Sequence, residues 1–416
     1  MLVTFSVANN LSFKKKVTLS MVAASVKEHA DHLILTPNPK LKLLKSAVIY
    51  GANASGKSNL IKSITFMRNC VLESANEKWL ETSYPFLFDT ESINRNSHFE
   101  IIFMLGEVRY RYGFELLKGK VQSEWLYSSL KAKERKLFKR ELGNIEPKFK
   151  EGKGLEERTR PNALFLSVCA QWNGEISTNI SNWFSNVNII SGIDDRRILP
   201  YSLKKLEDET NKNSILDFIK IADLQIEDIK SEKIKVTAEQ IPEDFPEELR
   251  KALLEKDASL SFTLHNKYDN ERKASGHVKL PINFESEGTL KIISLSAPIL
   301  EKLADGTILV IDEMDARLHP IITKELVKIF NTKNKNAQFI MATHDTNLLK
   351  KEYFRRDQIW FTEKDRYGAT DLYSLVEFKV RNDASYNKDY IMGKYGAVPF
   401  IGDFSTLTKE HETANE

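Results

Sequence analysis

The stretch GANASGKS, residues 51–58, directly follows the apolar run AVIY at 47–50. It matches the pattern G-x-x-x-x-G-K-[ST], whose glycines let backbone N–H groups surround phosphate oxygens. The next residues, NLIKSITFMRNCV at 59–71, place apolar side chains at helical spacing. This order of strand, glycine loop and helix predicts a phosphate-binding loop, with Lys57 at the β- and γ-phosphates and Ser58 on Mg²⁺. The alternative is a glycine-rich turn with an incidental lysine.

An acidic pair ends a second apolar strand, ILVIDE at 308–313. Asp312 at the end of such a strand can hold Mg²⁺, and Glu313 can orient or deprotonate water. Because successive strand residues point to opposite faces, the strand must end or twist at Glu313 for both carboxylates to face a nucleotide. The alternative is a helix cap. His344 ends the next apolar strand, QFIMATH at 338–344, where it can hydrogen-bond a γ-phosphate or an attacking water, although an isolated histidine is usually a surface residue.

A third motif, ESEGT at 285–289, precedes the apolar segment LKIISLSAPIL. Ser286 and Gly288 at the start of a helix can form an anion site, because the first N–H groups and the helix dipole favour negative charge. An ordinary helix N-cap is the alternative. The motif lies about two dozen residues before Asp312, so it belongs to the same part of the chain as the acidic pair.

Composition limits the class of protein. With 416 residues, 41% of them hydrophobic and 29% charged, the chain can bury a large core. A formal net charge of +3 excludes a globally basic nucleic-acid binder but not a local patch. Cys70 and Cys169 are far apart and show no disulfide or metal-binding spacing, which favours a reducing compartment. No apolar stretch approaches the roughly 18 residues of a membrane span, and no secretory signal is evident, so we expect a cytoplasmic protein.

The rest of the chain predicts an α/β fold with a β-rich subdomain. Residues 98–105 and 108–116 read as a hairpin, followed by a second pair of strands over 124–140. The basic run KAKERKLFKR at 131–140 suits either nucleic acid or, more simply, a solvated hairpin. From 258 onward strands and helices alternate, which indicates a mainly parallel sheet with helices on both faces. The predicted elements are strands at 307–311, 338–342, 358–361 and 372–378, a helix at 321–330, and a further helix between the strands at 338–342 and 358–361.

About 255 residues separate Lys57 from Asp312, so a segment is inserted between them. Residues 214–229 have an apolar helical face, whereas the charged stretch 230–257, with two prolines, reads as an exposed connector. Sustained heptads are absent from the sequence, which argues against a coiled coil and for a compact helical lobe. The expected domains are 1–170 and 258–403 as two parts of an ATPase head, 171–257 as the helical lobe, and 404–416 as a flexible tail.

As a set, these motifs resemble the ABC-type, SMC-like ATPases of prokaryotic anti-phage defence. Those proteins are AAA-family members of the AAA-15/21 type and are related to abortive-infection and Rlo-type loci. The resemblance extends over most of the chain and is carried by the segments NASGKSNLIKSI (53–64), PNALFLSV (161–168), ESEGTLKI (285–292), IDEMDARLHP (311–320), ATHDTNLL (342–349), DQIWFTEKD (357–365) and YIMGKYGAVPFIG (390–402). The implied fold is a P-loop NTPase with an ABC-type head, and the implied cofactors are ATP and Mg²⁺.

The resemblance also implies residue roles. Ser58 and Asp312 would hold Mg²⁺, Glu313 would be the catalytic base and His344 the switch histidine. Asp315 would contact the second subunit of a dimer. Ser286 and Gly288 would meet the γ-phosphate bound by that subunit, so that ATP is sandwiched in a homodimer or higher oligomer. The nucleotide-contacting residues of the loop would be Gly51, Asn53, Ala54, Ser55, Gly56, Lys57, Ser58 and Asn59.

Two departures from the pattern bear on function. The signature SEGT is not the LSGGQ of transporters, which argues against a membrane partner. SYPFLFD at 83–89 stands where the family has its Pro-Phe segment, and no glutamine there can be assigned to sensing Mg²⁺ or water. Because the chain shows no nuclease pattern of its own, the first hypothesis is an ATP-driven dimeric switch that controls a separate effector, such as a toxin or TOPRIM-like nuclease. The alternative is a DNA-tethering or repair ATPase, with DNA or RNA as the partner.

Overall fold

The computed structural model describes residues 1–130, 133–222, 225–235, 247, 257–381 and 384–399. The chain divides into two compact units. The phosphate-loop unit comprises Leu2–Ser185 and Ala342–Glu416, and the signature unit comprises Met1 and Asn186–Met341. The glycine loop and His344 therefore belong to one unit, whereas the acidic pair and the SEGT motif belong to the other. No helix in the described ranges is both long and apolar enough to cross a bilayer.

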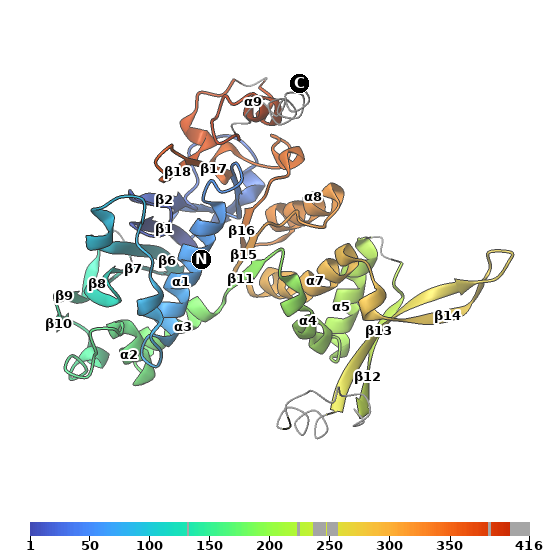
Figure 1. The fold of residues 1–416 in the computed structure, drawn as a ribbon, viewed down its shortest axis with the longest axis horizontal. Coiled ribbons are helices and arrows are strands. Elements are labelled where there is room, and N and C mark those ends of the chain that lie inside the picture. Colours follow the sequence, from blue (N-terminus) through green and yellow to red (C-terminus); the bar gives the residue numbers. More distant parts are fainter. Residues whose placement is uncertain (131–132, 223–224, 236–246, 248–256, 382–383, 400–416) are drawn as a thin grey trace, which may run out of the picture. The chain divides into compact units, whose positions relative to one another are not determined.

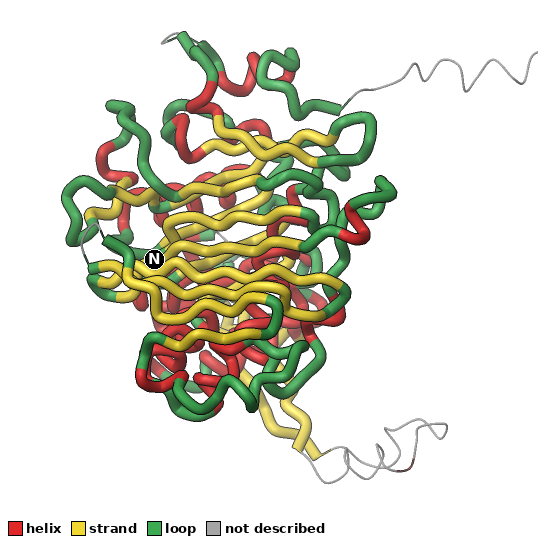
Figure 2. Tube along the Cα trace, turned by 90° about the vertical axis from the view of Figure 1, so that its left-hand side faces the viewer, coloured by secondary structure: helices red, strands yellow, loops and turns green. Residues whose placement is uncertain are grey.

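A seven-stranded antiparallel sheet is the larger sheet of the phosphate-loop unit (Figure 2). Its strands, in spatial order, are β10 (Asn144–Pro147), β9 (Arg135–Glu141), β8 (Lys120–Ser129), β7 (Val108–Leu117), β6 (Ser97–Leu105), β1 (Leu2–Ala8) and β2 (Val17–Ser20). Gly106, with φ of 59°, joins β6 to β7. The two predicted hairpins are thus confirmed, and the basic run lies in the second, although its residues 131–132 fall outside the described residues.

The predicted order of strand, glycine loop and helix is confirmed in β5 (Ser46–Tyr50) and α1 (Lys57–Glu73) (Figure 1). Every residue of β5 is buried. Next to it, β17 (Ile359–Lys364) runs parallel to β5, and β18 (Thr370–Ser374) runs antiparallel to β17. Helix α1 packs against the large sheet, where the Phe66 ring lies 5.0 Å from the Phe99 ring. The unit also contains β3 (Leu33–Leu35), β4 (Lys42–Leu44), α2 (Phe165–Gln171), α3 (Glu175–Ser185) and α9 (Tyr386–Ile391).

Parallel strands form the centre of the signature unit, as the alternating pattern predicts. β11 (Val187–Ser191), β15 (Ile308–Asp312) and β16 (Gln338–Ala342) pair in this order. They are accompanied by α7 (Glu287–Asp305) and α8 (Pro320–Lys328). Two details differ from the prediction. The segment after β16 forms only a short 3-10 turn, Thr346–Leu348, and β18 ends at Ser374 rather than continuing to 378.

The inserted segment is a mixture of helices and strands and not a helical lobe throughout. It contains α4 (Leu199–Lys205) and α5 (Glu209–Ile221), then a three-stranded antiparallel sheet of β12 (Asp228–Lys235), β13 (Asp257–Tyr268) and β14 (Ala274–Pro281). The helix predicted over 214–229 is wrong beyond Ile221, because α5 ends there with its C-cap at Ala222 and strand β12 begins at Asp228. Gln225, between the two elements, has a left-handed φ of 50°. Most of the predicted connector, with both of its prolines, and the predicted tail lie outside the described residues.

Candidate functional site

The glycine loop packs so closely on its neighbours that two of its residues have no room for a side chain. A Cβ on Gly51 would lie 2.5 Å from the carbonyl oxygen of Thr362, and a Cβ on Gly56 would lie 2.5 Å from Oγ1 of Thr370. Gly56 also has φ of 115° and caps α1. Steric contact with β17 and β18 therefore explains both glycines of the motif.

Hydrogen bonds hold the loop in this shape. The Ser55 hydroxyl lies 2.7 Å from the Thr362 hydroxyl, and the Thr370 hydroxyl donates to the Ser55 carbonyl oxygen at 2.8 Å. Asn59 reaches away from the loop, donating to the Ser12 hydroxyl at 2.9 Å. Ala54 has a left-handed φ of 61°. The loop is thus preorganised by side chains from β17, β18 and the turn after β1, which a reading of the motif alone does not reveal.

The ammonium of Lys57 lies on the loop itself. It donates to the carbonyl oxygens of Gly51 at 2.8 Å and Ala52 at 3.0 Å, and the side chain is buried. Burying a lysine is costly unless its charge is paired or hydrogen-bonded, so this contact fixes a positive charge at the site. An ammonium at this position can also bind phosphate oxygens.

A cavity of about 660 Å³ opens beside the loop, within the size range of small-molecule sites. Its walls include Gly51, Asn53, Ala54 and Ser55 together with His344, so the structure brings the glycine loop and the predicted switch histidine to one cavity. Two hydrogen bonds fix this arrangement: the Thr343 N–H donates to the Ile49 carbonyl at 3.2 Å, and the Tyr50 hydroxyl donates to the Asp345 carbonyl at 3.2 Å.

One wall of the cavity was not predicted. It comes from α9 and the turn that follows, with Tyr390, Ile391, Ala397, Val398 and Pro399. The Tyr390 hydroxyl donates to the Ala397 carbonyl at 3.0 Å and fixes the turn. The glycine in YGAVP is a turn signal in the sequence. In the structure Gly396 and Ala397 both have positive φ, of 66° and 58°. Only the tertiary structure shows that this turn faces the glycine loop.

In the signature unit the strand breaks at the acidic pair. β15 ends at Asp312, and Glu313 has a left-handed φ of 51°, which is rare for a residue with a side chain. The strand therefore stops where the prediction placed the break. Strain of this kind is concentrated at functional sites.

Asp312 has a feature that fits a metal ligand. Its Oδ1 atom is buried, and no residue in the described part of the chain gives it a hydrogen bond. Buried carboxylate oxygens are nearly always satisfied, so an oxygen of this kind is suited to a bound cation. Mg²⁺ prefers hard oxygen ligands. The donor set at Asp312 is therefore compatible with the predicted Mg²⁺.

The SEGT motif begins α7. Ser286 is the N-cap and accepts a hydrogen bond from the Thr289 N–H at 3.1 Å, so the ordinary capping role is present. Gly288 lies against the turn after the acidic pair, since a Cβ there would be 2.9 Å from the Arg317 carbonyl oxygen. Arg317 in turn pairs with Glu287 at 3.1 Å. The signature residues and the turn that contains Asp315 are thus packed together.

The predicted site residues fall into two groups. Gly51, Asn53, Ala54, Ser55, Gly56, Lys57, Ser58, Asn59 and His344 lie in the phosphate-loop unit, and Ser286, Gly288, Asp312, Glu313 and Asp315 lie in the signature unit. Within each group the structure brings the residues to one edge or turn. Their assignment to catalysis, to nucleotide and to a second subunit stays a prediction.

Comparison with known proteins supports the same fold. Residues 46–350 match the model of a family described as "AAA domain, putative AbiEii toxin, Type IV TA system". No curated protein matches the chain. Together with the strand, loop and helix around residues 46–73, this match shows an α/β P-loop NTPase fold of the ABC-head type with several sheets, as predicted.

Heads of SMC proteins are among the solved structures that resemble the chain. One, an SMC head bound to the C-terminal winged-helix domain of ScpA, is 15% identical with a TM-score of 0.46 and covers 90% of this chain and 97% of its own. The SMC head domain of Thermotoga maritima is 13% identical with a TM-score of 0.41, covering 90% and 98%. An SMC head derived from Pyrococcus furiosus, bound to the C-terminal domain of ScpA, is 13% identical with a TM-score of 0.37, covering 95% and 98%.

Proposed function

Because the chain belongs to the AAA family described as "AAA domain, putative AbiEii toxin, Type IV TA system", we propose that it hydrolyses ATP and uses the nucleotide to switch a dimer. Family membership implies nucleotide binding and ATPase activity of the P-loop kind, in which Mg²⁺ accompanies the nucleotide. The switch would control a separate effector protein in anti-phage defence. We infer the role in defence from the family description, which names a toxin of the AbiEii type.

The observation that carries the proposal is the cavity shared by the glycine loop and His344. A triphosphate in this cavity would meet loop N–H groups, the helix N-terminus of α1 and the ammonium of Lys57. The ammonium would exchange the carbonyl oxygens of Gly51 and Ala52 for phosphate oxygens. His344, which also lines the cavity, would hydrogen-bond the γ-phosphate or the attacking water and so respond to hydrolysis.

Hydrolysis needs a metal and a base. Ser58 and Asp312 would hold Mg²⁺, and the ion would supply positive charge to offset the negative charge that develops during hydrolysis. Glu313, turned away from the strand by its left-handed backbone, would accept a proton from the water that attacks the γ-phosphate. Ser286 and Gly288 of a second copy would donate to the same phosphate, and Asp315 would contact that copy.

The alternative of a nucleic-acid tether has less support. In the basic run, Lys136 pairs with Glu146 at 3.1 Å, Lys139 pairs with Glu141, and Arg140 is buried. Each of these three cations is therefore either paired with a carboxylate or buried. Non-specific DNA binding depends on cations that neutralise phosphates. The solvated hairpin is the better interpretation of this segment.

The substitution Glu313→Gln tests the proposal. The variant should bind ATP as the wild type does, lose at least about 99% of turnover and accumulate an ATP-bound dimer, because the amide cannot accept the proton. Phosphate release and light scattering after gel filtration measure these effects. The matched control is Glu325→Gln on α8, whose side chain is 46% exposed. Unchanged turnover would remove Glu313 from the role of base. Strong DNA binding that weakens steeply with salt would favour the tether instead.

A further inference from the structure

We propose that His29, Asp31 and His32 form a binding site for a divalent transition metal, with Zn²⁺ as the preferred ion. One ring nitrogen of each histidine and one carboxylate oxygen of Asp31 lie within 4.8 Å of one another. It is the only group of three such side chains found in the described ranges of the chain. The proposal is independent of the ATPase function, because none of these residues touches the phosphate cavity.

The site lies at the opposite end of the strands from the glycine loop. Gln358, which contacts His32, also donates to the hydroxyl of Ser46, the first residue of β5. Gln358 itself immediately precedes β17. The phosphate loop follows Tyr50, the last residue of β5. The two sites therefore occupy the amino and carboxyl ends of the same parallel strands.

Local backbone geometry places the two histidines together. His32 ends the 3-10 turn η1 (Ala30–His32), and three residues per turn bring positions 29 and 32 to the same side. Their rings stack, with centroids 4.4 Å apart and planes 10° from parallel. His29 itself has φ of 37° and ψ of 69°, a left-handed conformation that costs free energy in a residue with a Cβ. Such strain persists only where the surrounding structure enforces it.

Hydrogen bonding fixes which nitrogen of His32 can bind an ion. The backbone N–H of Arg355 donates to Oε1 of Gln358 at 2.9 Å, so this atom is the amide oxygen and an acceptor. His32 Nδ1 lies 3.0 Å from the same oxygen and must therefore donate to it. The lone pair of the neutral ring is left on Nε2, which lies 4.0 Å from Oδ2 of Asp31.

The same reasoning applies to His29. Its Nε2 lies 2.5 Å from the carbonyl oxygen of Lys351, which can only accept, so Nε2 donates and Nδ1 carries the lone pair. Each histidine thus donates one ring N–H to a protein oxygen and keeps the lone pair of its other nitrogen for an ion. This arrangement is typical of metal-binding histidines. Burial lowers the pKa of His32, which favours the neutral ligand form at neutral pH.

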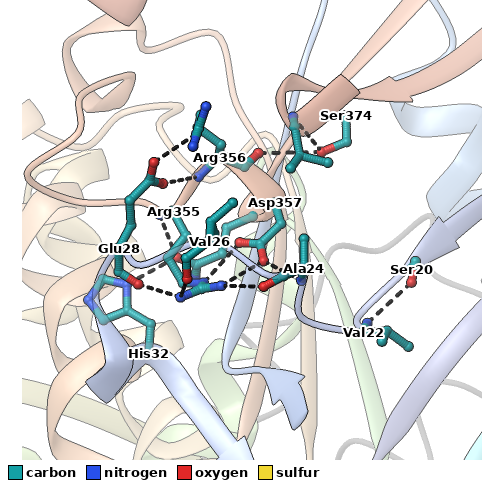
Figure 3. Close-up of polar contacts among 12 residues, drawn as sticks. Ser20, Val22, Ala24, Val26, Glu28, His32, Arg355, Arg356, Asp357 and Ser374 are labelled. Atoms are coloured by element: carbon teal, nitrogen blue, oxygen red, sulfur yellow. Dashed lines mark hydrogen bonds and ion pairs between the residues drawn. The ribbon is translucent and has the colours of Figure 1, made fainter. Parts of the chain in front are cut away.

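A buried arginine makes the loop before His29 rigid (Figure 3). The guanidinium of Arg355 donates to the carbonyl oxygens of Ala24 and Glu28 and pairs with Asp357 at 2.8 Å. Asp357 also accepts the backbone N–H of Ala24 at 2.7 Å, and Glu28 pairs with Arg356 at 2.7 Å. The backbone that carries the site is thus held by a network that does not depend on the ion. Preorganisation of this kind lowers the cost of ordering ligands.

Two neutral imidazoles and one carboxylate are a ligand set for Zn²⁺ that keeps a position open for water. Ligand atoms sit about 2.0–2.2 Å from Zn²⁺, so the three donors must move slightly closer together than they are. Asp31 can supply this movement, because its side chain is 60% exposed. The thiols of Cys70 and Cys169 do not compete for the ion, since both are buried and burial raises the pKa of each.

Titration with Co²⁺ tests the site. The 416-residue chain is stripped of metal and then kept in excess Mg²⁺, so that a magnesium site at the nucleotide would not take up Co²⁺. It should bind one Co²⁺ per chain, with visible bands of nitrogen and oxygen ligands and no thiolate charge-transfer band, and Zn²⁺ should displace the Co²⁺. His29→Ala and His32→Ala should abolish binding. His98→Ala, which removes a histidine of the same unit paired with Glu115, should leave binding intact.

Asp31→Asn is a second test that remains informative if the histidine variants fail to fold, because Asp31 is on the surface. It should fold normally and bind Co²⁺ at least about tenfold more weakly, since loss of one supporting group typically costs that much. Zn²⁺ should raise the melting temperature of the wild type more than that of Asp31→Asn. The proposal is overturned if the wild type takes up no Co²⁺, or if Asp31→Asn and His32→Ala bind it as tightly as the wild type.

Discussion

The ammonium of Lys291 donates to the carbonyl oxygen of Ala316 at 2.5 Å, joining the signature helix α7 to the turn after the acidic pair. The lysine is fully buried. It also donates to the carbonyl oxygen of Gly192 at 3.0 Å and to the carbonyl oxygen of Glu313 at 3.4 Å. A single side chain thus fixes three backbone carbonyls. Because one of them belongs to Glu313, displacement of the helix start would move the proposed catalytic base.

This relationship predicts the effect of Lys291→Met. The carbonyl oxygens of Gly192 and Ala316 would lose a donor, and each unsatisfied buried acceptor costs about 1–3 kcal/mol in the free energy of unfolding. We also expect ATP turnover to fall at least about tenfold, since a small displacement of catalytic groups has effects of this size. ATP binding should persist, because Lys57 lies in the other unit. Urea unfolding, nucleotide binding and phosphate release measure the three effects.

The matched control is Lys302→Met, which removes a second buried lysine of the same helix. It should destabilise the protein without a comparable loss of turnover. If Lys291→Met loses stability but keeps the wild-type turnover, the lysine is structural and does not position Glu313.

The two roles of Ser286 can be separated by charge. Asp and Asn cap helices as well as Ser does, so Ser286→Asp and Ser286→Asn should each keep the free energy of unfolding within about 0.5 kcal/mol. The carboxylate of Ser286→Asp would repel a γ-phosphate presented by a second copy, and we expect turnover and ATP-dependent dimer formation to be lost. The neutral Ser286→Asn should retain most of both. Equal turnover in the two variants would leave Ser286 as a cap alone.

Substitution of Asp312 should separate stability from function. The buried Oδ1 atom without a partner in the described part of the chain is unfavourable in the folded protein unless a cation is bound. Asp312→Asn removes the charge, so the melting temperature without Mg²⁺ should stay unchanged or rise, as at other functional sites where stability is sacrificed. Mg²⁺-dependent turnover should fall at least about a hundredfold. A marked loss of stability without Mg²⁺ would show that the carboxylate serves the fold.

The sequence predicted those features that depend on local geometry. The glycine loop was predictable because Gly51 and Gly56 are required by sterics, and the break at Glu313 followed from the alternation of side chains along a strand. The helix predicted over 214–229 failed because the apolar period continues through Ile226, whereas α5 ends at Ile221 and the backbone at Gln225 is left-handed. Apolar periodicity indicates which side chains are buried, but it does not determine the backbone angles of the residues between them.

Features that depend on contacts distant in sequence were beyond prediction. Nothing near Arg355 in the sequence indicates that its guanidinium would be buried against a loop more than 300 residues earlier. The cavity wall from α9 is a second case, since Tyr390 reaches the glycine loop only because its ring stacks on Phe361 of β17, with centroids 5.4 Å apart. Both are specified by tertiary packing, for which a single sequence carries no direct signal.

That wall supplies the last prediction. The Tyr390 hydroxyl holds the Ala397 carbonyl, and both residues line the cavity that also contains the glycine loop and His344. Tyr390→Phe removes this hydrogen bond and keeps the ring. Because such a bond contributes about 1 kcal/mol, we expect the turn at Ala397 to loosen and the Kd for a fluorescent ATP analogue to rise about fivefold.

The matched control for this wall is Tyr386→Phe, a buried tyrosine of the same helix that does not line the cavity. It should leave the Kd unchanged. Turnover at saturating ATP should be similar in both variants, because neither residue belongs to the proposed acid–base or metal groups. If Tyr390→Phe and Tyr386→Phe change the Kd equally, the effect comes from the stability of α9, and the wall does not contact the nucleotide.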